Sequence, residues 1–322
     1  MQATSHTYDV IVVGELNVDL ILNQLNEMPV TGREIFAGDM ALTLGSSAAI
    51  LASNLSSFGA RVAFIGKIGT DIFGQVVIDH LERAGVHAGM IIRDSSLATG
   101  ASIGLQHNGD RGMVTYPGAM AHFSIDDIPL HRLQEARHLH FSSYFFQPGM
   151  QQHLANLFRT AKMMGLTTSF DMQTDPEHRW DINYAAILPY VDIFFPNENE
   201  LMQITRKENL EAAIEEISAL VPVLALKLGA SGSVTVCNGE TVSQPAFHAG
   251  DLVDAIGAGD SFNAGFLLKY LENAPIAECQ AYGNIAGAIS TTAAGGTSAF
   301  HEQKSLDQYA KETFAYPGAG IT

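Results

Sequence analysis

Cysteine is scarce in this chain, whose 322 residues include only Cys237 and Cys279, far apart in the sequence. They form no CxxC pair, so the spacing typical of zinc ribbons and dithiol redox sites is absent. Two separated cysteines are typical of reduced proteins rather than of a disulfide framework. We therefore expect a cytoplasmic protein in which both thiols are structural.

Positive charge is also scarce, because 17 Lys and Arg stand against 34 Asp and Glu, for a net charge of −17. Binding to nucleic acid needs clustered basic side chains, and the sequence has no such block. There is no run of 18 or more apolar residues, and the first seven residues lack the basic start and apolar core of a secretory signal. Neither nucleic acid nor a membrane is therefore expected as a partner.

Three common functional motifs are missing as well. No GxxxxGK[ST] loop is present, and the residues after the first expected strand, Gly14-Glu15-Leu16-Asn17, are not GxGxxG. A P-loop NTPase and a dinucleotide-dependent dehydrogenase are therefore not expected. His138 and His140 would share one face of a strand, but no third ligand accompanies them, which favours ordinary core or surface histidines over a zinc site.

Apolar residues make up 47% of the chain, enough for a sizeable core. Short β-rich runs alternate with helical patterns, which predicts βαβ units and a mainly parallel sheet covered by helices on both faces. The expected strands are 10–13, 62–65, 138–141, 167–170, 193–195 and 223–227, and the expected helices are 48–58, 73–83, 151–164, 261–271, 277–293 and 305–313.

Two segments, 20–44 and 98–117, interrupt this alternation. The second has strand-like patterns on both sides of an Asn-Gly turn at 108–109, which is a strong hairpin signal. The small residues of 315–322 are typical of a loose C-terminal tail. We therefore expect a single α/β domain over 1–314.

The most informative stretch lies between 254 and 262. Gly257 and Gly259 let an anion approach the backbone N–H groups, and the following apolar spacing predicts a helix whose first amides are free to bind it. Asp260 stands at this point, either as an ordinary helix N-cap or as a base beside an anion. The run reads Asp254-Ala255-Ile256-Gly257-Ala258-Gly259-Asp260-Ser261-Phe262.

This run resembles the signature of the ribokinase-like (PfkB) carbohydrate kinases, which commonly read Asp-Thr-x-Gly-Ala-Gly-Asp-x-Phe; only the Thr differs, as Ala255. Other motifs of the family follow in its order. They are Gly14-Glu15-Leu16-Asn17-Val18-Asp19, Gly45-Ser46-Ser47 with 62–74, Pro196-Asn197-Glu198-Asn199-Glu200, and Lys227-Leu228-Gly229-Ala230-Ser231-Gly232.

The resemblance implies a ribokinase-like three-layer αβα fold with a mainly parallel central sheet and a small β-sheet lid made from 20–44 and 98–117. It also implies an ATP- and Mg²⁺-dependent phosphotransferase that acts on a hydroxyl group of a small sugar or sugar-like molecule. Asp260 would be the general base, and the N–H groups of Gly257, Ala258 and Gly259 would hold the transferring phosphoryl group. In several members the lid also makes a dimer contact, so a homodimer through the lid is expected.

The family pattern assigns the other site residues too. Asn17 and Asp19 would bind the acceptor hydroxyls, with Gly45, Ser46 and Tyr144 beside them. Glu200 would organise Mg²⁺ through water, although Asn197 and Glu200 also fit a capping box. The remaining implied positions are Asn197, Lys227, Gly229 and Gly232 on the nucleotide side and Asp254 beside a monovalent cation such as K⁺.

One departure concerns the acceptor. The family has an Asn that binds the sugar where this chain has Ile50, and an apolar side chain cannot bind a hydroxyl group. Plain ribose is therefore not the favoured acceptor. A nucleoside kinase of the same family stays an alternative, because Tyr144 and Phe145 could face a base. A catalytically silent sugar- or nucleotide-binding homologue is the other alternative, and the presence of Asp260 argues against it.

Overall fold

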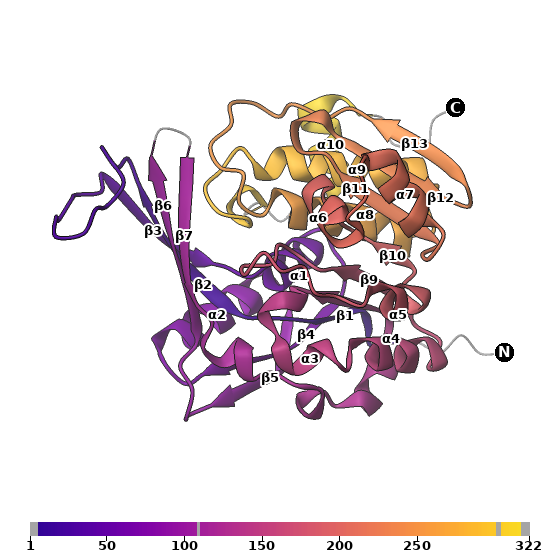
Figure 1. Ribbon diagram of the computed structural model, residues 1–322, viewed down its shortest axis with the longest axis horizontal. Coiled ribbons are helices and arrows are strands. Elements are labelled where there is room, and N and C mark those ends of the chain that lie inside the picture. Colours follow the sequence, from indigo (N-terminus) through magenta and orange to yellow (C-terminus); the bar gives the residue numbers. More distant parts are fainter. Residues whose placement is uncertain (1–5, 108–109, 301–303, 317–322) are drawn as a thin grey trace.

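The computed structural model describes residues 6–107, 110–300 and 304–316. Its centre is a nine-stranded sheet in the order β13-β12-β11-β10-β9-β8-β1-β4-β5, and every neighbouring pair is parallel except β11–β12 and β12–β13. Helices cover both faces of this sheet (Figure 1), so the predicted three-layer α/β fold is confirmed.

The strands of the central sheet are β1 (Tyr8–Val13), β4 (Val62–Gly69), β5 (His87–Asp94), β8 (Ala136–Ser142), β9 (Thr167–Asp171), β10 (Ile193–Phe194), β11 (Val223–Lys227), β12 (Ser233–Cys237) and β13 (Glu240–Gln244). The α-helices are α1 (Ser47–Ser57), α2 (Ile72–Arg83), α3 (Pro148–Gln151), α4 (Leu154–Met163), α5 (Tyr184–Ile187), α6 (Glu198–Thr205), α7 (Leu210–Ser218), α8 (Ala258–Leu271), α9 (Ile276–Ser290) and α10 (Leu306–Phe314).

The core lies on both faces of the sheet, as a parallel sheet requires. In β1, Val10 and Val12 belong to one apolar cluster, whereas Ile11 and Val13 belong to the other. Helices α8 and α9 pack closely on the first cluster, where a Cβ added to Gly265 would lie 2.4 Å from the carbonyl oxygen of Tyr282. This tight contact fixes the helix that carries the candidate base.

Several helices differ from the sequence-based prediction: α5 and α7 were not expected, and α9 ends at Ser290 rather than at 293. α8 begins at Ala258 rather than at 261, because Gly257 takes a left-handed backbone conformation (φ 72°) and is the N-cap. The helix expected over 151–164 corresponds to α4, which begins only at Leu154 and ends at Met163, while Gln151 is the last residue of the short helix α3.

A second sheet of four strands, in the order β3-β2-β6-β7, stands beside the central one (Figure 1). Its strands are β2 (Asn17–Asn23), β3 (Asp39–Leu44), β6 (Gly100–His107) and β7 (Asp110–Tyr116). They come from the two segments expected to form a lid, and we call this sheet the lid. β6 and β7 pair antiparallel up to His107 and Asp110, while the expected Asn108-Gly109 turn lies outside the described residues.

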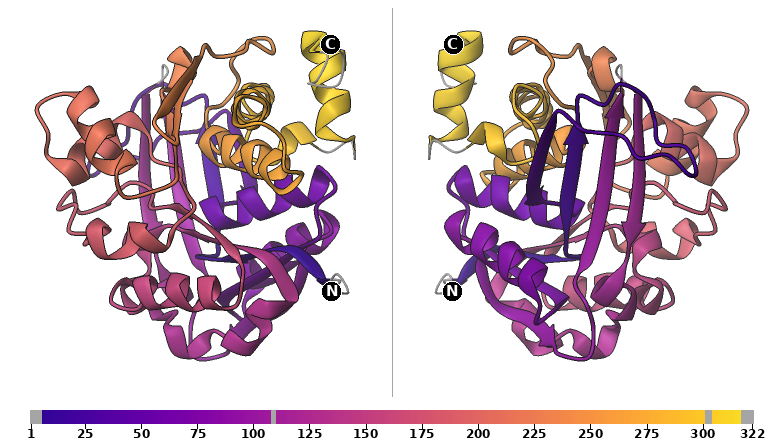
Figure 2. Two further views of the ribbon diagram at one scale, coloured as in Figure 1. Left: turned by 90° about the vertical axis from the view of Figure 1, so that its right-hand side faces the viewer. Right: turned by 90° about the vertical axis from the view of Figure 1, so that its left-hand side faces the viewer.

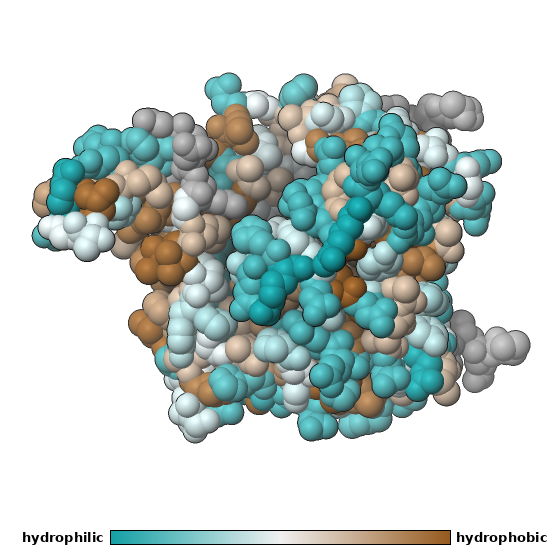
Figure 3. Space-filling model, viewed as in Figure 1, coloured by the Kyte–Doolittle hydropathy of each residue, from teal (hydrophilic) through white to brown (hydrophobic). Residues whose placement is uncertain are grey.

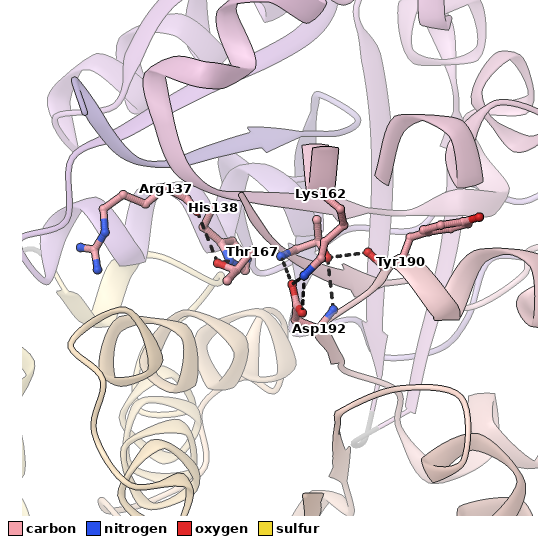
Figure 4. Close-up of polar contacts among 7 residues, drawn as sticks. Arg137, His138, Lys162, Thr167, Tyr190 and Asp192 are labelled. Atoms are coloured by element: carbon pink, nitrogen blue, oxygen red, sulfur yellow. Dashed lines mark hydrogen bonds and ion pairs between the residues drawn. The ribbon is translucent and has the colours of Figure 1, made fainter. Parts of the chain in front are cut away.

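A polar cluster closes the edge of the central sheet where the parallel strands begin (Figure 4). Lys162 of α4 donates to both carboxylate oxygens of Asp192 at 2.6 and 2.7 Å. The same carboxylate accepts the backbone N–H of Thr168 at 2.8 Å, and the Thr168 hydroxyl donates to the carbonyl of Tyr190 at 2.7 Å. The cluster ties α4 and β9 to the start of β10.

At the C-terminal end, Ala315 and Tyr316 of the expected tail still contact the fold. The Tyr316 ring lies 5.9 Å from Phe247 and 5.8 Å from Tyr282, both edge-on, and the rest of the tail (317–322) lies outside the described residues. Throughout the described part of the chain, each helix is too short or too polar to span a bilayer.

Candidate active site

A cleft of about 930 Å³ opens between the lid and the edge of the central sheet where the parallel strands end. The lid projects from the body of the molecule and leaves a recess beside it (Figure 3). Ligands of open α/β sheets bind at this edge. The predicted site residues that line the cleft are Asn17, Asp19, Ser46, Asn197, Glu200, Lys227, Gly229, Gly257, Gly259 and Asp260.

The first turn of α8 forms one wall of the cleft. A side chain at Gly257 would collide with the loop opposite, since an added Cβ would lie 2.4 Å from the Cα of Gly296. The first hydrogen bond of the helix runs from the N–H of Ser261 to the carbonyl of Gly257, so the preceding amides are left for turn contacts or a ligand. The N–H of Ala258 already donates to Ala255 in such a turn at 3.3 Å. Gly257 and Gly259 line the cleft, whereas Ala258 does not.

Asp260 is the third residue of α8 and not its N-cap, which rules out the capping interpretation. The residue is 7% exposed, and its carboxylate accepts a hydrogen bond from Nε2 of Gln173 at 3.1 Å. Burial, reinforced by the nearby charge of Asp171, raises the pKa of Asp260 to about 7. A carboxylate with a pKa near neutrality is suited to accept and return a proton at physiological pH.

Lys227 ends β11 and extends into the cleft beside Asp260. Its Nζ lies 2.7 Å from Oδ2 of Asp171, a fully buried carboxylate at the end of β9. The same oxygen accepts from Nδ2 of Asn263, one turn along α8, at 2.5 Å. Burial opposes the charge on Lys227, but the carboxylates of Asp171 and Glu200 outweigh it and raise the pKa of the Lys227 amine.

Asn197 and Glu200 form the capping box of α6. The N–H of Glu200 donates to Oδ1 of Asn197, and the N–H of Asn197 donates to Oε2 of Glu200, both at 2.9 Å. Both residues nevertheless line the cleft. Burial, together with the charge of Asp171, raises the pKa of Glu200 to about 7. The capping and functional interpretations are therefore compatible.

The lid supplies the opposite wall. Nδ2 of Asn17 donates to Oδ1 of Asp19 at 3.0 Å and to the hydroxyl of Ser102 at 3.1 Å. Gly45 makes room for this group, because a Cβ there would lie 2.3 Å from Oδ1 of Asp19. The result is a buried set of amide, carboxylate and hydroxyl groups that suits a ligand carrying hydroxyl groups.

Four predicted residues have other roles in the structure. Ser46 is the N-cap of α1, and its hydroxyl donates to the carbonyl of Glu15 at 2.6 Å. Tyr144 does not reach the cleft: it is 5% exposed and packs in the core against Phe170, while Phe145 faces the cleft.

Gly232 serves a backbone turn, since a Cβ there would lie 2.1 Å from the carbonyl oxygen of Gln244. The carboxylate of Asp254 accepts the N–H groups of Ile256 and Gly295, each at 3.0 Å. It therefore ties the loop before α8 to the loop after α9, behind the cleft rather than in its lining.

The structure brings to the site three polar residues that were not among the predicted site residues. Asp171 pairs with Lys227, Gln173 contacts Asp260, and Glu15 lines the cleft with its Oε2 buried and unpaired among the described residues. Burial raises the pKa of Glu15 as well. The sequence could have indicated two of them. Glu15 and Asp171 stand at or just beyond the ends of expected parallel strands, where ligands of such sheets bind.

The family model for pfkB family carbohydrate kinases matches residues 8–303. An uncharacterized sugar kinase of Archaeoglobus fulgidus is 30% identical over 73% of this chain and 92% of its own length. An ATP-dependent ribose-1-phosphate kinase of Halopiger xanaduensis is 27% identical over 90% of this chain and 94% of its own.

A solved structure shares the fold throughout. A putative ribokinase II of E. coli, in complex with ATP and Mg²⁺, superposes with a TM-score of 0.84 over 95% of this chain and 99% of its own, at 21% identity.

Proposed function

Because this chain belongs to the PfkB family of carbohydrate kinases, we propose that it transfers the γ-phosphoryl group of ATP to a hydroxyl group of a sugar or sugar-like molecule bound in the cleft. Asp260 accepts the proton of that hydroxyl. The acceptor oxygen forms a bond to the γ-phosphorus while the bond between that phosphorus and the bridging oxygen of ADP breaks. The products are ADP and the phosphorylated acceptor.

One observation carries this proposal: Asp260 stands in the first turn of α8, buried beside Gly257 and Gly259, within a cleft whose other wall holds Asn17 and Asp19. The helix N-terminus stabilises negative charge on a phosphoryl group. The buried carboxylate removes a proton from an acceptor held on the lid side. The phosphoryl group at the N-terminus of α8 and the acceptor on the lid side would therefore meet within one cleft.

The residues present suit ATP and Mg²⁺. Lys227 and Gly229 line the cleft next to α8, and a Cβ built on Gly229 meets no atom within 4 Å, so its backbone faces open space. They would hold the phosphates, and Glu200 would hold Mg²⁺ through water. When bound, Mg²⁺ neutralises charge on the transferring phosphates. Local donors are needed because the chain carries a net charge of −17.

The lining of the acceptor side favours a sugar and leaves a second candidate. Asn17, Asp19 and Ser102 offer hydroxyl-binding groups, whereas Ile50 and Phe145 give the cleft apolar surface. Phe145 presents an aromatic ring on which a nucleobase could stack, and this observation favours a nucleoside as the runner-up acceptor.

The proposal also includes a K⁺ site beside Asp254 and a cytoplasmic location. Asp254 joins the two loops that flank the N-terminus of α8, so a monovalent cation beside it would act on the shape of the phosphate site. Both cysteines are free thiols, and Cys279 is buried, in agreement with a reducing compartment.

The test is Mg²⁺-dependent ADP release from ATP across pentoses, hexoses, sugar acids and nucleosides, with Asp260→Asn in parallel. We expect turnover with one acceptor class and a loss of about 10²–10⁴-fold in the variant. An unchanged rate in Asp260→Asn would show that Asp260 is not the base. Binding of ATP without turnover of any acceptor would favour a silent binding homologue.

We further propose that the lid joins two copies of the chain. The face of the lid opposite Asn17 and Asp19 is apolar, because its strand registers align Leu20 with Leu42 and Ile103, and Ile103 with Val114. Exposed apolar side chains on this face are Met40 (65%), Leu42 (41%), Ile103 (41%), Val114 (68%) and Tyr116 (59%).

Figure 2 (right) shows the lid strands in front of the rest of the molecule, and Figure 3 shows apolar residues on the lid. Contiguous apolar surface of this kind marks association sites. Sedimentation at micromolar concentration should give two chains for the wild type and one chain for Val114→Lys. Wild-type protein that sediments as a single chain would refute the dimer.

A further inference from the structure

Gln173 joins the candidate base to the buried ion pair behind it. It lies two residues beyond the end of β9, in the wall of the cleft. Its side-chain Nε2 donates to Oδ2 of Asp171 at 3.0 Å and to Oδ1 of Asp260 at 3.1 Å. Since Asp171 also accepts from Lys227, these contacts form a continuous chain from the lysine to the base.

The chemistry of the side chain suits this place. Both partners are carboxylates, which accept hydrogen bonds, and a primary amide nitrogen carries two hydrogens that can point to two separate acceptors. The opposite orientation would set the amide oxygen against two acceptor oxygens. A Leu in this position would have no donor, and a Glu would add a third negative charge to those of Asp171 and Asp260. Of these three side chains, only Gln can donate to both carboxylates.

The loop that carries Gln173 is firmly held. The backbone of Gln173 is left-handed (φ 60°), and its N–H donates to Oδ1 of Asp171 at 3.2 Å. Asp175, which is 4% exposed, accepts the N–H groups of Glu177, Arg179 and Trp180 at 2.9, 2.8 and 2.7 Å. The Trp180 ring then packs edge-on against Phe145 at 5.7 Å. The amide is therefore fixed by its loop before any ligand binds.

We propose that Gln173 is a positioning residue for phosphoryl transfer: it fixes the carboxylate of Asp260 by linking it to the Asp171–Lys227 ion pair. This inference rests on the proposed function, because it requires Asp260 to be the base. A hydrogen bond donated to a carboxylate favours its charged form, so Gln173 keeps Asp260 ready to accept a proton.

Other charged groups near Asp260 also affect its pKa. Asp171 from β9, Glu15 after β1 and Glu200 from α6 disfavour the charged carboxylate, whereas Lys227 from β11 favours it. All four remain in a Gln173→Leu variant. A change in its pH profile would therefore report the loss of the amide donor.

The experiment is the pH profile of kcat for wild type and Gln173→Leu, with whichever acceptor the panel identifies. We expect the acid limb of the profile to move upward by about one pH unit, because one hydrogen bond to a charged group is removed. At pH 7 kcat should fall about fivefold, and at pH 9 it should return to within about threefold of wild type. The KM for ATP should stay within about threefold.

Three further variants decide the outcome. Thr174→Val removes a hydroxyl from the same wall of the cleft but leaves the Gln173 amide in place, so the midpoint of the acid limb should not move. Gln173→Glu keeps the length of the side chain and should move the acid limb further than Gln173→Leu does, which preserves the test if the Leu variant folds poorly. In the Asp260→Asn background, Gln173→Leu should cause no additional loss of kcat.

A loss of the same size at every pH, or no loss at all, would overturn the positioning role while leaving Asp260 as the base. Full activity of Asp260→Asn would instead overturn the proposed function on which the inference rests.

Discussion

At the edge of the central sheet where the parallel strands begin, Asp192 pairs with Lys162 and accepts the N–H of Thr168 (Figure 4), and the side chains of Lys162 and Asp192 are partly exposed. At the opposite edge Lys227 is the cation of the cleft lining among the described residues, and it faces Asp171, Glu200 and Asp260. The carboxyl groups of Glu200 and Asp260 both have pKa values raised to about 7.

The two edges differ in how much of their buried charge has a partner. Burial of like charges lowers stability unless partners neutralise them, so such groups gather where chemistry needs them. The first edge fastens helices and strands together. Under the proposed function, the second would supply a proton acceptor and a place for a bound, positively charged partner such as Mg²⁺.

Removal of Lys227 should destabilise the protein far more than removal of Lys162. Lys227→Met leaves the fully buried Asp171 without its ion-pair partner, and we expect a loss of about 3–5 kcal/mol in the free energy of unfolding. Lys162→Met breaks a pair whose side chains are 37% and 17% exposed, so the loss should be at most about 1 kcal/mol. Urea unfolding of both variants measures the difference.

The double variant Lys227→Met/Asp171→Asn is the control. If the unpaired carboxylate causes the loss, the second substitution should restore most of the stability. Equal losses from the two lysine variants would mean that the two edges do not differ in the way described.

Many of the strands and helices could be predicted from the sequence, because each is encoded by the pattern of a short segment. The alternation of β-rich runs with helical patterns predicted the central sheet and most of its helices. The start of α8 was placed three residues late because Gly257 takes a left-handed N-cap conformation, which a helical pattern does not reveal. Tyr144 was preferred to Phe145, but Ser143 (φ 62°) turns the chain and sends Tyr144 into the core.

The rest of the site depends on contacts between distant parts of the chain. Lys227 and Asp171 are 56 residues apart, and Gln173 and Asp260 are 87 residues apart. No local spacing records such pairs. The family resemblance named Lys227 and Asp260 individually, while the structure shows which groups hold them.

The stability contributed by Asp260 should also depend on pH, with a smaller effect. The pKa of Asp260 is raised in the folded protein to about 7 from the ordinary value of 3.8, so the folded state binds more protons between these values. Its contribution to stability is therefore fully present below about pH 4 and is lost as pH rises through 7. Relative to wild type, Asp260→Asn should gain stability with rising pH, on the order of 2–3 kcal/mol between pH 5 and pH 8.

Thr168→Val, at the opposite edge, is the matched comparison. It removes a hydroxyl that donates to the carbonyl of Tyr190, so it should cost about 1 kcal/mol at every pH from 5 to 8 and leave ADP release unchanged. Thermal unfolding across this pH range measures both variants. A gain for Asp260→Asn that does not grow between pH 5 and pH 8 would show that Asp260 is charged throughout this range. The two edges would then differ only in the burial of their ion pairs, Lys162–Asp192 and Lys227–Asp171.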